Sequence, residues 1–312
     1  MNIRGLNKMN YYKEKIREMY NRDGITSLFL ASVKYTLYQT AILISNFANS
    51  IPISIINNKL LKENRRFKNI HKNKRCFIIG NGPSLKKHNL SLLKNEITFV
   101  VNAFWKHPII KEWQPTYYCI ADPVFFDGSG IMRNFFENLF LGVNNSKFFI
   151  PQYSRKLIKN NKLPFPKEKT NYIAFRDDLC RKTLTSIDIT NYIPGVINVT
   201  ELAMMIAIYM GCTPIYLIGF DHDWLSHRSK DRHFYKEETV SNHKKATGTF
   251  KNISYIVTIK DVLKLWQGYE NLSKYSNKKG INILNASKGG FLDVFERVKY
   301  ESIFSQNNNK EL

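Results

Sequence analysis

Short apolar runs alternate with longer helix-like segments along the chain after residue 75. Each run lacks the polar alternation of a half-exposed strand and is typical of a parallel strand that is buried on both faces. The alternation predicts an α/β fold with a mostly parallel sheet flanked by helices. The predicted strands are Cys76–Ile79, Ile97–Val101, Tyr117–Ala121, Lys147–Ile150, Pro214–Ile218 and Ile281–Leu284.

The clearest predicted helix covers residues 196–210. It is apolar almost all round, which indicates burial between two layers of structure. Pro194-Gly195 precedes this helix, and Gly211 is suited to end it.

Residues 24–58 form an apolar segment with one internal charge, Lys34. Asparagines and a proline interrupt its second half, which argues against a transmembrane helix. Two alternatives remain open: a helix that lies in the membrane interface, followed by basic residues, or a pair of helices that packs on the catalytic domain or on another subunit. The predicted organisation is an N-terminal helical, basic extension over residues 1–74 and a catalytic domain over residues 75–312.

The length of 312 residues allows one full α/β core and an appendage. The formal net charge is +22, and the basic residues gather before residue 76. Such an excess favours an anionic membrane surface or a phosphorylated substrate over nucleic acid, because no RNA-binding or zinc-finger signature accompanies it. A merely basic surface is the alternative. The four widely spaced cysteines are typical of buried thiols in a reducing cytoplasm, and the polar N-terminus is unlike a cleavable signal.

The strand Cys76–Ile79 runs directly into the turn Gly-Asn-Gly-Pro-Ser, residues 80–84. The glycines allow a ligand to approach the backbone closely, and Ser84 can cap a following helix whose free N–H groups would point at an anion. The turn therefore predicts a nucleotide or another phosphorylated ligand. It lacks the third glycine of the dinucleotide fingerprint and the Gly-Lys of a P-loop, so a turn that uses glycine for geometry alone is the alternative.

Polar side chains also follow other predicted strands. Asn102 and Asp122 end two of them and should reach the same sheet edge as the glycine turn, where they can bind a nucleotide or only cap the next turns. Asp221 and Asp223 follow the strand Pro214–Ile218, and this Asp-x-Asp spacing either holds a divalent cation against a diphosphate or arises by chance.

Residues 221–250 are dense in titratable and aromatic side chains, lack periodicity and follow a predicted buried strand, so they predict a lid over the site. Three histidines fall in this lid, His227, His233 and His243. Histidine exchanges protons near neutral pH and suits a general base. His233 is the best placed, because two aromatic residues follow it. Serine-hydrolase and zinc-protease motifs are absent, which argues against those chemistries.

Six motifs occur in order along residues 75–300: Ile78-Ile-Gly-Asn-Gly-Pro-Ser-Leu85, Val101-Asn-Ala-Phe104, Gly195-Val-x-Asn-Val199, Ile215-Tyr-Leu-Ile-Gly-Phe-Asp221, His233-Phe234 and Asn285-Ala-Ser-x-Gly-Gly-Phe-Leu-Asp-Val-Phe295. Together they resemble the domain shared by hydroxymethylpterin pyrophosphokinase-like proteins and the motility accessory factor glycosyltransferases. The first five motifs also resemble the bacterial family 42 sialyltransferases, which use CMP-activated nonulosonic acids.

The resemblance implies a Rossmann-like, GT-A-like sialyltransferase domain with a lid, in which His233 is the general base and Asp221 lies at the nucleotide and the sugar. Asp122 stands where those sialyltransferases have Asn, and Pro194 stands where they have a Ser before Gly195, so the identity of the donor stays open. The residues expected to bind the nucleotide are Asn81, Gly82, Ser84, Asn102 and Gly195 by resemblance, joined by Gly80, Asp122 and Asp223 from their positions.

Together these features predict a glycosyltransferase that moves a sialic-acid-like nonulosonate from a CMP donor to a surface glycan or lipid-linked acceptor. The enzyme is expected to require no cofactor, with Mg²⁺ optional, and to work in the cytoplasm, peripherally on the inner face of an anionic membrane, with the N-terminal helices available for a homo-oligomer. One alternative is an ATP- and Mg²⁺-dependent pterin diphosphokinase. The other is a nucleotide-binding scaffold without catalysis.

Overall fold

The computed structural model describes residues 59–305 apart from 182, 227–232 and 236–253. Contacts divide the chain into two compact units, Met1–Asn57 and Asn58–Leu312, and every described residue belongs to the second. Residues 59–74, which the sequence pattern assigns to the N-terminal extension, therefore lie in the same compact unit as the sheet.

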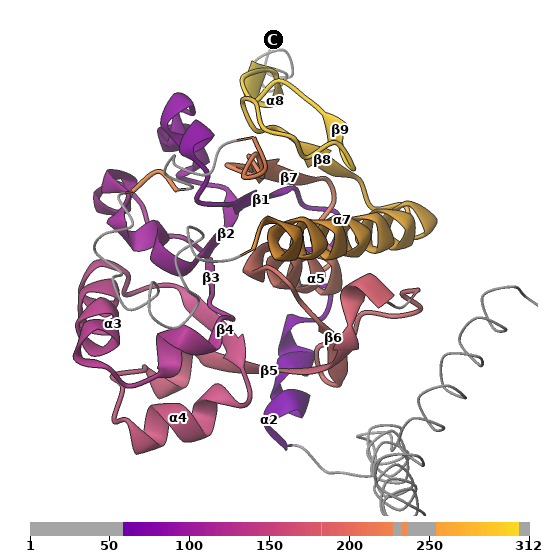
Figure 1. Ribbon diagram of the computed structural model, residues 1–312. Coiled ribbons are helices and arrows are strands. Elements are labelled where there is room, and N and C mark those ends of the chain that lie inside the picture. Colours follow the sequence, from indigo (N-terminus) through magenta and orange to yellow (C-terminus); the bar gives the residue numbers. More distant parts are fainter. Residues whose placement is uncertain (1–58, 182, 227–232, 236–253, 306–312) are drawn as a thin grey trace, which may run out of the picture. The chain divides into compact units, whose positions relative to one another are not determined.

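The second unit is built on one nine-stranded sheet with the order β6-β5-β4-β3-β2-β1-β7-β8-β9 (Figure 1). All neighbouring strands are parallel. The predicted α/β class, a parallel sheet flanked by helices, is confirmed. The strands are β1 (Cys76–Ile79), β2 (Ile97–Val101), β3 (Tyr117–Cys119), β4 (Lys147–Pro151), β5 (Thr170–Asp178), β6 (Tyr192–Gly195), β7 (Ile215–Ile218), β8 (Ile283–Asn285) and β9 (Glu296–Arg297).

The strand order reverses at β1. The chain adds β2 to β6 on one side of this strand and then returns to add β7 to β9 on the other. In open parallel sheets, ligands bind beyond the carboxyl ends of the strands near such a reversal. The segments that follow β1 and β7 are therefore the first place to look for a site.

Helices cover both faces of the sheet, with α3 on one side and α5 and α7 on the other (Figure 1). The α-helices are α2 (Lys59–Lys62), α3 (Gly130–Gly142), α4 (Ser154–Asn160), α5 (Val199–Tyr209), α7 (Tyr255–Lys278) and α8 (Ser302–Ser305). The 3₁₀ turns are η1 (Glu63–Phe67), η2 (Pro83–Lys87), η3 (Leu90–Leu93), η4 (Asn102–Lys106), η5 (Pro108–Lys111), η6 (Pro123–Phe126), η7 (Lys167–Lys169) and η8 (Leu179–Arg181).

All six predicted strands are present; β1 and β2 have the predicted bounds, and the ends of the other four differ by at most two residues. The predicted helix 196–210 is α5, which begins at Val199 because Asn198 and Glu201 form a capping box there. Gly211 follows it with a positive φ of 81°, as expected of a residue that ends a helix. The pattern did not predict β5, β6, β9 or α7.

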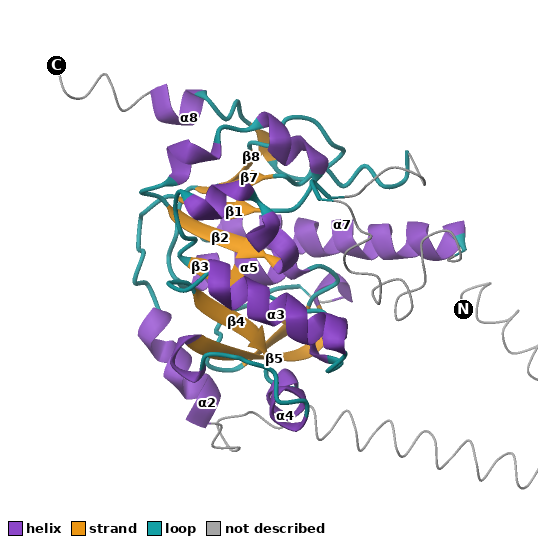
Figure 2. Cartoon of the chain, turned by 90° about the vertical axis from the view of Figure 1, so that its left-hand side faces the viewer, coloured by secondary structure: helices purple, strands orange, loops and turns teal. Residues whose placement is uncertain are grey.

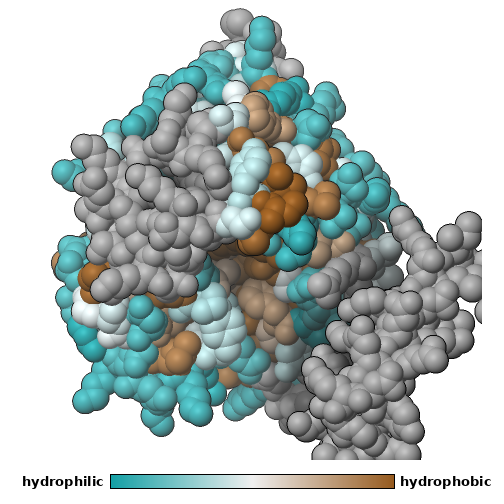
Figure 3. Space-filling view, viewed as in Figure 1, coloured by the Kyte–Doolittle hydropathy of each residue, from teal (hydrophilic) through white to brown (hydrophobic). Residues whose placement is uncertain are grey.

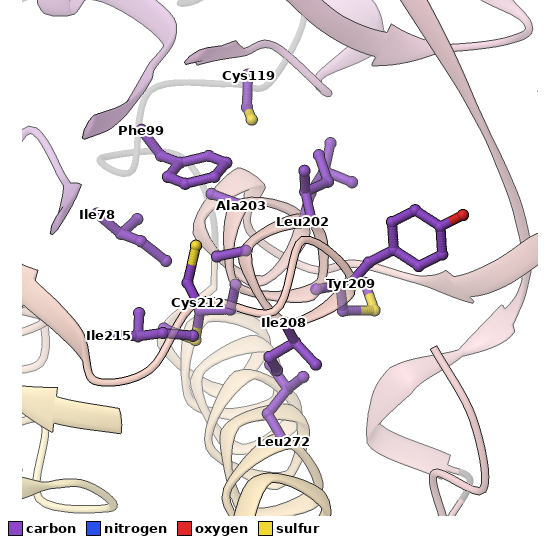
Figure 4. Close-up of a cluster of buried hydrophobic side chains, with 14 of the residues drawn as sticks. Ile78, Phe99, Cys119, Leu202, Ala203, Ile208, Tyr209, Cys212, Ile215 and Leu272 are labelled. Atoms are coloured by element: carbon purple, nitrogen blue, oxygen red, sulfur yellow. The ribbon is translucent and has the colours of Figure 1, made fainter. Parts of the chain in front are cut away.

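α5 is buried along its whole length, which its all-round apolar sequence predicts. Figure 4 shows Leu202 and Ala203 near Phe99 and Cys119 of the sheet, with Leu272 of α7 beyond the helix. α5 is thus the middle layer between the sheet and α7, and its N-terminus has a fixed position at the sheet edge.

Aromatic side chains fill the opposite face, where α3 lies across the strands (Figure 2). The ring of Phe136 on α3 lies 4.5 Å from that of Phe165, and Phe135 lies 5.1 Å from Phe125 of η6. Edge and offset contacts of this kind add to the stabilisation from buried area. They hold η6 and α3 against the sheet.

Residues 59–74 pack on the β3–β5 side of the sheet. Phe67 is buried, with its ring 5.1 Å from that of Phe149. The buried amide of Asn64 donates to the carbonyls of Tyr172 (2.8 Å) and Ile189 (2.9 Å). These long-range contacts explain why the compact unit begins before β1.

On the face shown in Figure 3, the coloured surface is mostly hydrophilic at its periphery, with an apolar patch where α7 lies in Figure 1. Exposed apolar residues at the start of this helix include Ile256, Val257 and Leu263. Among the described residues, no helix has the length and apolar character needed to cross a bilayer. All four cysteines are free thiols, and Cys180 is the one that is not buried.

Candidate functional site

The turns after β1 and β7 are in direct contact at the switch point. The backbone N–H of Gly82 donates to the carbonyl of Gly219 (3.0 Å). A Cβ on Gly80 would lie 2.5 Å from that same carbonyl oxygen, and one on Gly82 would lie 2.7 Å from the carboxyl carbon of Asp221. The two glycines are therefore required because backbone and carboxylate approach too closely for any side chain.

Asp221 occupies the position that the sequence analysis expects an external anion to take. Ser84 donates its backbone N–H to one carboxylate oxygen (2.7 Å) and its hydroxyl to the other. Both residues are buried. Ser84 does not cap η2 with its side chain, and the anion at the start of this turn comes from the chain itself. Gly80, Gly82, Ser84 and Asp221 thus form one structural clamp between β1 and β7.

The C-terminal motif supports this clamp from the other side. Ser287 accepts the N–H of Phe220 (2.9 Å), and Phe291 donates its N–H to the carbonyl of Asp221 (2.7 Å). Gly290 has a positive φ of 81°, and a Cβ there would lie 2.3 Å from that carbonyl. This supporting role of the C-terminal motif was not predicted from the sequence.

A cavity of about 500 Å³ opens at the carboxyl ends of β2, β3, β4 and β6. Three predicted site residues line it together, Asn102, Asp122 and Gly195. Tyr153 and Phe175 add aromatic rings, and residues 196–199 bring the start of α5 to the wall. Asn102 and Asp122 both line this cavity, whereas the glycine turn, which was expected at the same edge, does not.

Two buried amide oxygens near this cavity lack hydrogen-bond partners among the described residues, Oδ1 of Asn81 and Oδ1 of Asn102. The amide of Asn81 is oriented by its Nδ2, which donates to the carbonyl of Val101 (3.0 Å). A buried acceptor left without a donor costs about 1–3 kcal/mol. A ligand that brought N–H or O–H donors to these oxygens would recover that cost.

Asp122 lines the cavity and also caps a turn. Its Oδ1 accepts the N–H of Val124 (3.0 Å) at the start of η6. Both alternatives from the sequence are therefore compatible with its position. Asp223 lies beyond the clamp, in the loop after β7, and does not line the cavity. Among the described residues, no group of three or more His, Cys, Asp or Glu side chains is arranged to hold a metal ion.

The described part of the predicted lid places His233 beside the strand ends. The N–H of Phe234 donates to the carbonyl of Asn81 (2.8 Å), and the ring of Phe234 lies 5.1 Å from that of His107. The imidazole of His233 stacks on Tyr235, with 4.9 Å between ring centroids and an interplanar angle of 10°. His227 and His243 lie outside the described residues.

Sequence reasoning missed the residue that shapes the α5 side of the cavity, Glu201. Its carboxyl group is buried and accepts the N–H groups of Ile197 (2.7 Å) and Asn198 (2.9 Å). Burial raises the pKa of Glu201 to about 8. The spacing Asn198-x-x-Glu201 is a capping box, and this signal could have identified both residues.

A buried hydrogen-bond chain connects the loop after β7 with the same wall. Nε2 of His222 lies 2.8 Å from the hydroxyl of Tyr269, which lies 2.8 Å from the hydroxyl of Thr200. Thr200 in turn donates to Oδ1 of Asn198 (3.1 Å). Burial lowers the pKa of His222 to about 3, so its imidazole is neutral in the folded protein. The chain joins β7, α7 and α5 behind the cavity.

The family model for 6-hydroxymethylpterin diphosphokinase MptE-like proteins matches residues 54–227. A search of curated proteins finds no match to this chain.

The chain is also similar to solved sialyltransferase structures. CstII from Campylobacter jejuni, in complex with the substrate analogue CMP-3FNeuAc, is 17% identical, and the match covers 72% of this chain and 86% of that one, with a TM-score of 0.45. CST-II with a trisaccharide acceptor and CMP has the same identity and coverage and a TM-score of 0.43. The monofunctional alpha-2,3-sialyltransferase Cst-I from Campylobacter jejuni is 14% identical, covers 76% of this chain and 93% of its own length, and has a TM-score of 0.36.

The buried imidazole of His222 makes stability depend on pH. Its folded-state pKa of about 3 lies below the ordinary 6.5, so its contribution is fully present above pH 6.5 and is lost as the pH falls toward 3. Between pH 7.5 and pH 5 this group should remove about 2 kcal/mol of the free energy of unfolding. We expect the free energy of unfolding of His222→Gln, measured by urea unfolding at the two pH values, to lack this pH-dependent loss.

Tyr269→Phe is the matched control, because it removes the hydrogen bond to His222 and keeps the imidazole. It should retain the pH dependence of the native protein. If the free energy of unfolding fell by the same amount between pH 7.5 and pH 5 in the native protein and in His222→Gln, the assignment to His222 would be wrong.

Proposed function

The chain belongs to the 6-hydroxymethylpterin diphosphokinase MptE-like family, and we propose that it is a glycosyltransferase that uses a nucleotide-activated sugar. The donor we propose is a CMP-linked, sialic-acid-like nonulosonate, and the acceptor is a surface glycan or a lipid-linked glycan. The observation that carries the proposal is the cavity lined by Asn102, Asp122 and Gly195, next to two buried amide oxygens for which the described part of the chain offers no donor.

The nucleotide would lie across the carboxyl ends of the strands. Oδ1 of Asn102 and Oδ1 of Asn81 suit the amino group of a cytosine or the hydroxyls of a ribose, since both are acceptors without a donor in the described structure. Tyr153 and Phe175 offer aromatic surface to a base. The cavity volume of about 500 Å³ is within the usual range for small-molecule sites, about 300–1,000 Å³.

The phosphate would lie at the start of α5. This 11-residue helix directs the positive end of its dipole at the cavity, where residues 195–199 form the wall. The glycine turn after β1 is not required for this task, because the carboxylate of Asp221 already accepts from Ser84 there. Its role in this proposal is to hold Asn81 in place.

His233 would act as the general base. In the proposed reaction, an acceptor hydroxyl gives its proton to the imidazole as its oxygen bonds to the anomeric carbon of the donor. The bond from that carbon to the phosphate oxygen breaks, its electron pair leaves with CMP, and the configuration inverts. The leaving group is a phosphomonoester, whose charge hydrogen-bond donors can share, so the reaction requires no metal ion.

A pterin diphosphokinase is the second candidate, because the description of the family favours it. Transfer of a diphosphate from ATP needs a divalent cation to neutralise the phosphate charges. Asp122, Asp221 and Asp223 are the acidic residues near the strand ends that would hold it. The kinase would therefore depend on a divalent cation, whereas the proposed transferase would not.

Thermal shift with CMP, CTP, UDP and ATP, each with and without Mg²⁺, distinguishes the candidates. The transferase should be stabilised by CMP without metal, because a ligand present at 100 times its Kd adds about 2.7 kcal/mol to the free energy of unfolding. Stabilisation by ATP alone, and only with Mg²⁺, would instead support the kinase and overturn the proposal.

His233→Ala should leave the CMP-induced thermal shift unchanged and lower sugar transfer by about 10²-fold or more, as expected for loss of a general base. Transfer is measured by mass spectrometry with a panel of CMP- and UDP-linked sugars. His107→Ala is the control, because its ring contacts Phe234 outside the proposed chemistry. Undiminished turnover in His233→Ala would remove this residue from the role.

We also propose that residues 1–58 bring the enzyme to the cytoplasmic face of an anionic membrane. Support comes from the apolar segment 24–58 and the basic residues that follow it. Deleting residues 1–57 leaves the second compact unit whole and should release the protein from vesicles that contain anionic lipid, measured by co-sedimentation. Retention of the shortened protein would show that this segment is not the anchor.

A further inference from the structure

A second cavity, of about 420 Å³, lies at the opposite end of the turn η4 from the residue that lines the first. Asn102 at the start of η4 lines the first cavity, and Trp105 and Lys106 at its end line the second. The other wall of the second cavity is one face of α3, formed by residues at positions 130, 131, 134, 135 and 138. Two neighbouring cavities thus share one five-residue turn.

The walls of the second cavity combine aromatic surface with amide groups. Trp105 and Phe135 contribute rings in edge-to-face contact at 5.7 Å, and Asn134 and Asn138 contribute side-chain amides. The buried indole N–H of Trp105 has no acceptor among the described residues. Aromatic faces beside a few hydrogen-bonding groups suit a ring that carries apolar C–H faces and several hydroxyls, as a sugar does.

The second cavity also favours negative charge. The ammonium group of Lys106 lies 5.8 Å from the ring centroid of Trp105, and burial lowers the pKa of Lys106. A partly desolvated cation gains more from an anion than an exposed one does. Gly130 and Ile131, the first residues of α3, line the same cavity, and the positive end of a 13-residue helix adds to the attraction.

The proposed general base lies near the second cavity. The ammonium of Lys106 lies 5.2 Å from the ring centroid of Tyr235, and that ring stacks on the imidazole of His233. A base that deprotonates an acceptor must come within hydrogen-bond reach of the acceptor hydroxyl. Because one tyrosine ring separates His233 from Lys106, which lines the second cavity, a sugar bound there would lie close to the base.

We propose that the second cavity is the acceptor subsite and that it binds a sugar carrying a carboxylate or a phosphate, an assignment that rests on the proposed glycosyltransferase function. Lys106 and the start of α3 contact the acidic group, and Trp105 and the two asparagines contact the ring. The acidic group thereby directs a neighbouring hydroxyl toward His233.

Three sugars that differ only at C6 test this proposal: glucose, glucuronic acid and glucose 6-phosphate. Binding to the full-length chain is measured by ligand-observed NMR without nucleotide, so that the result does not depend on the donor. We expect at least one acidic sugar to bind about tenfold more tightly than glucose, and Lys106→Met to reduce that ratio to about one, because a charge-assisted contact is lost. A preference for glucuronic acid identifies a carboxylate, and a preference for glucose 6-phosphate identifies a phosphate.

Lys111→Met is the matched control, because this exposed lysine lies in the next turn, η5, and does not line the cavity. A second variant, Asn134→Trp, replaces an exposed residue at the cavity wall and should weaken all three sugars at least tenfold by filling the space. Both cavity variants should keep the CMP-induced thermal shift of the native protein, which separates this proposal from the nucleotide site.

Three results would overturn the assignment: no binding of either acidic sugar to a protein that binds CMP, an unchanged acid preference in Lys106→Met, or inorganic phosphate binding as tightly as glucose 6-phosphate. The last result would reduce the cavity to an anion site without a sugar subsite.

Discussion

The hydrogen bonds between Asp221 and Ser84 join the two halves of the sheet at the point where the strand order reverses. Without them, the carboxylate of Asp221 and the N–H of Ser84 would be buried without each other as hydrogen-bond partners, and an unpaired polar group is costly to bury. The glycines on both strands allow the close approach that these bonds require. The position of Asn81, and with it the edge of the first cavity, depends on this clamp.

The fold was predictable where burial is complete. β1 and β2 lie in the middle of the sheet with both faces covered, so β1 is an unbroken apolar run and β2 contains one polar residue, Thr98. β5 carries Thr170 and Asn171 at its start and charged residues at its end, and β6 contains Pro194 at the sheet edge. α7 buries only one narrow stripe, and most of its residues are polar or exposed. Because such partly covered elements mix polar and apolar residues, their hydrophobic pattern is weak and does not predict them.

The location of the site could be predicted from the sheet topology, but the partners of its polar groups could not. Parallel strands deliver their carboxyl ends to one edge, so the convergence of Asn102 and Asp122 follows from placing each at a strand end, whereas Gly195 was expected there from the family resemblance alone. The partner of the glycine turn could not be predicted in this way, because Asp221 lies 137 residues from Ser84. A local pattern predicts that a turn can hold an anion. Only the packing of distant strands decides whether that anion comes from the chain or from a ligand.

A single side chain of the sheet fixes the turn that separates the two cavities. The hydroxyl of Tyr118, on β3, donates to the carbonyl of Asn102 (2.6 Å) and accepts the N–H of Trp105 (3.1 Å). Between these bonds, Asn102 has a positive φ of 48°, a conformation that asparagine tolerates better than most residues. Tyr118 is wholly buried and cannot move independently of the strand. The distance between the two proposed subsites is therefore set by the rigid sheet, as transfer between two bound substrates requires.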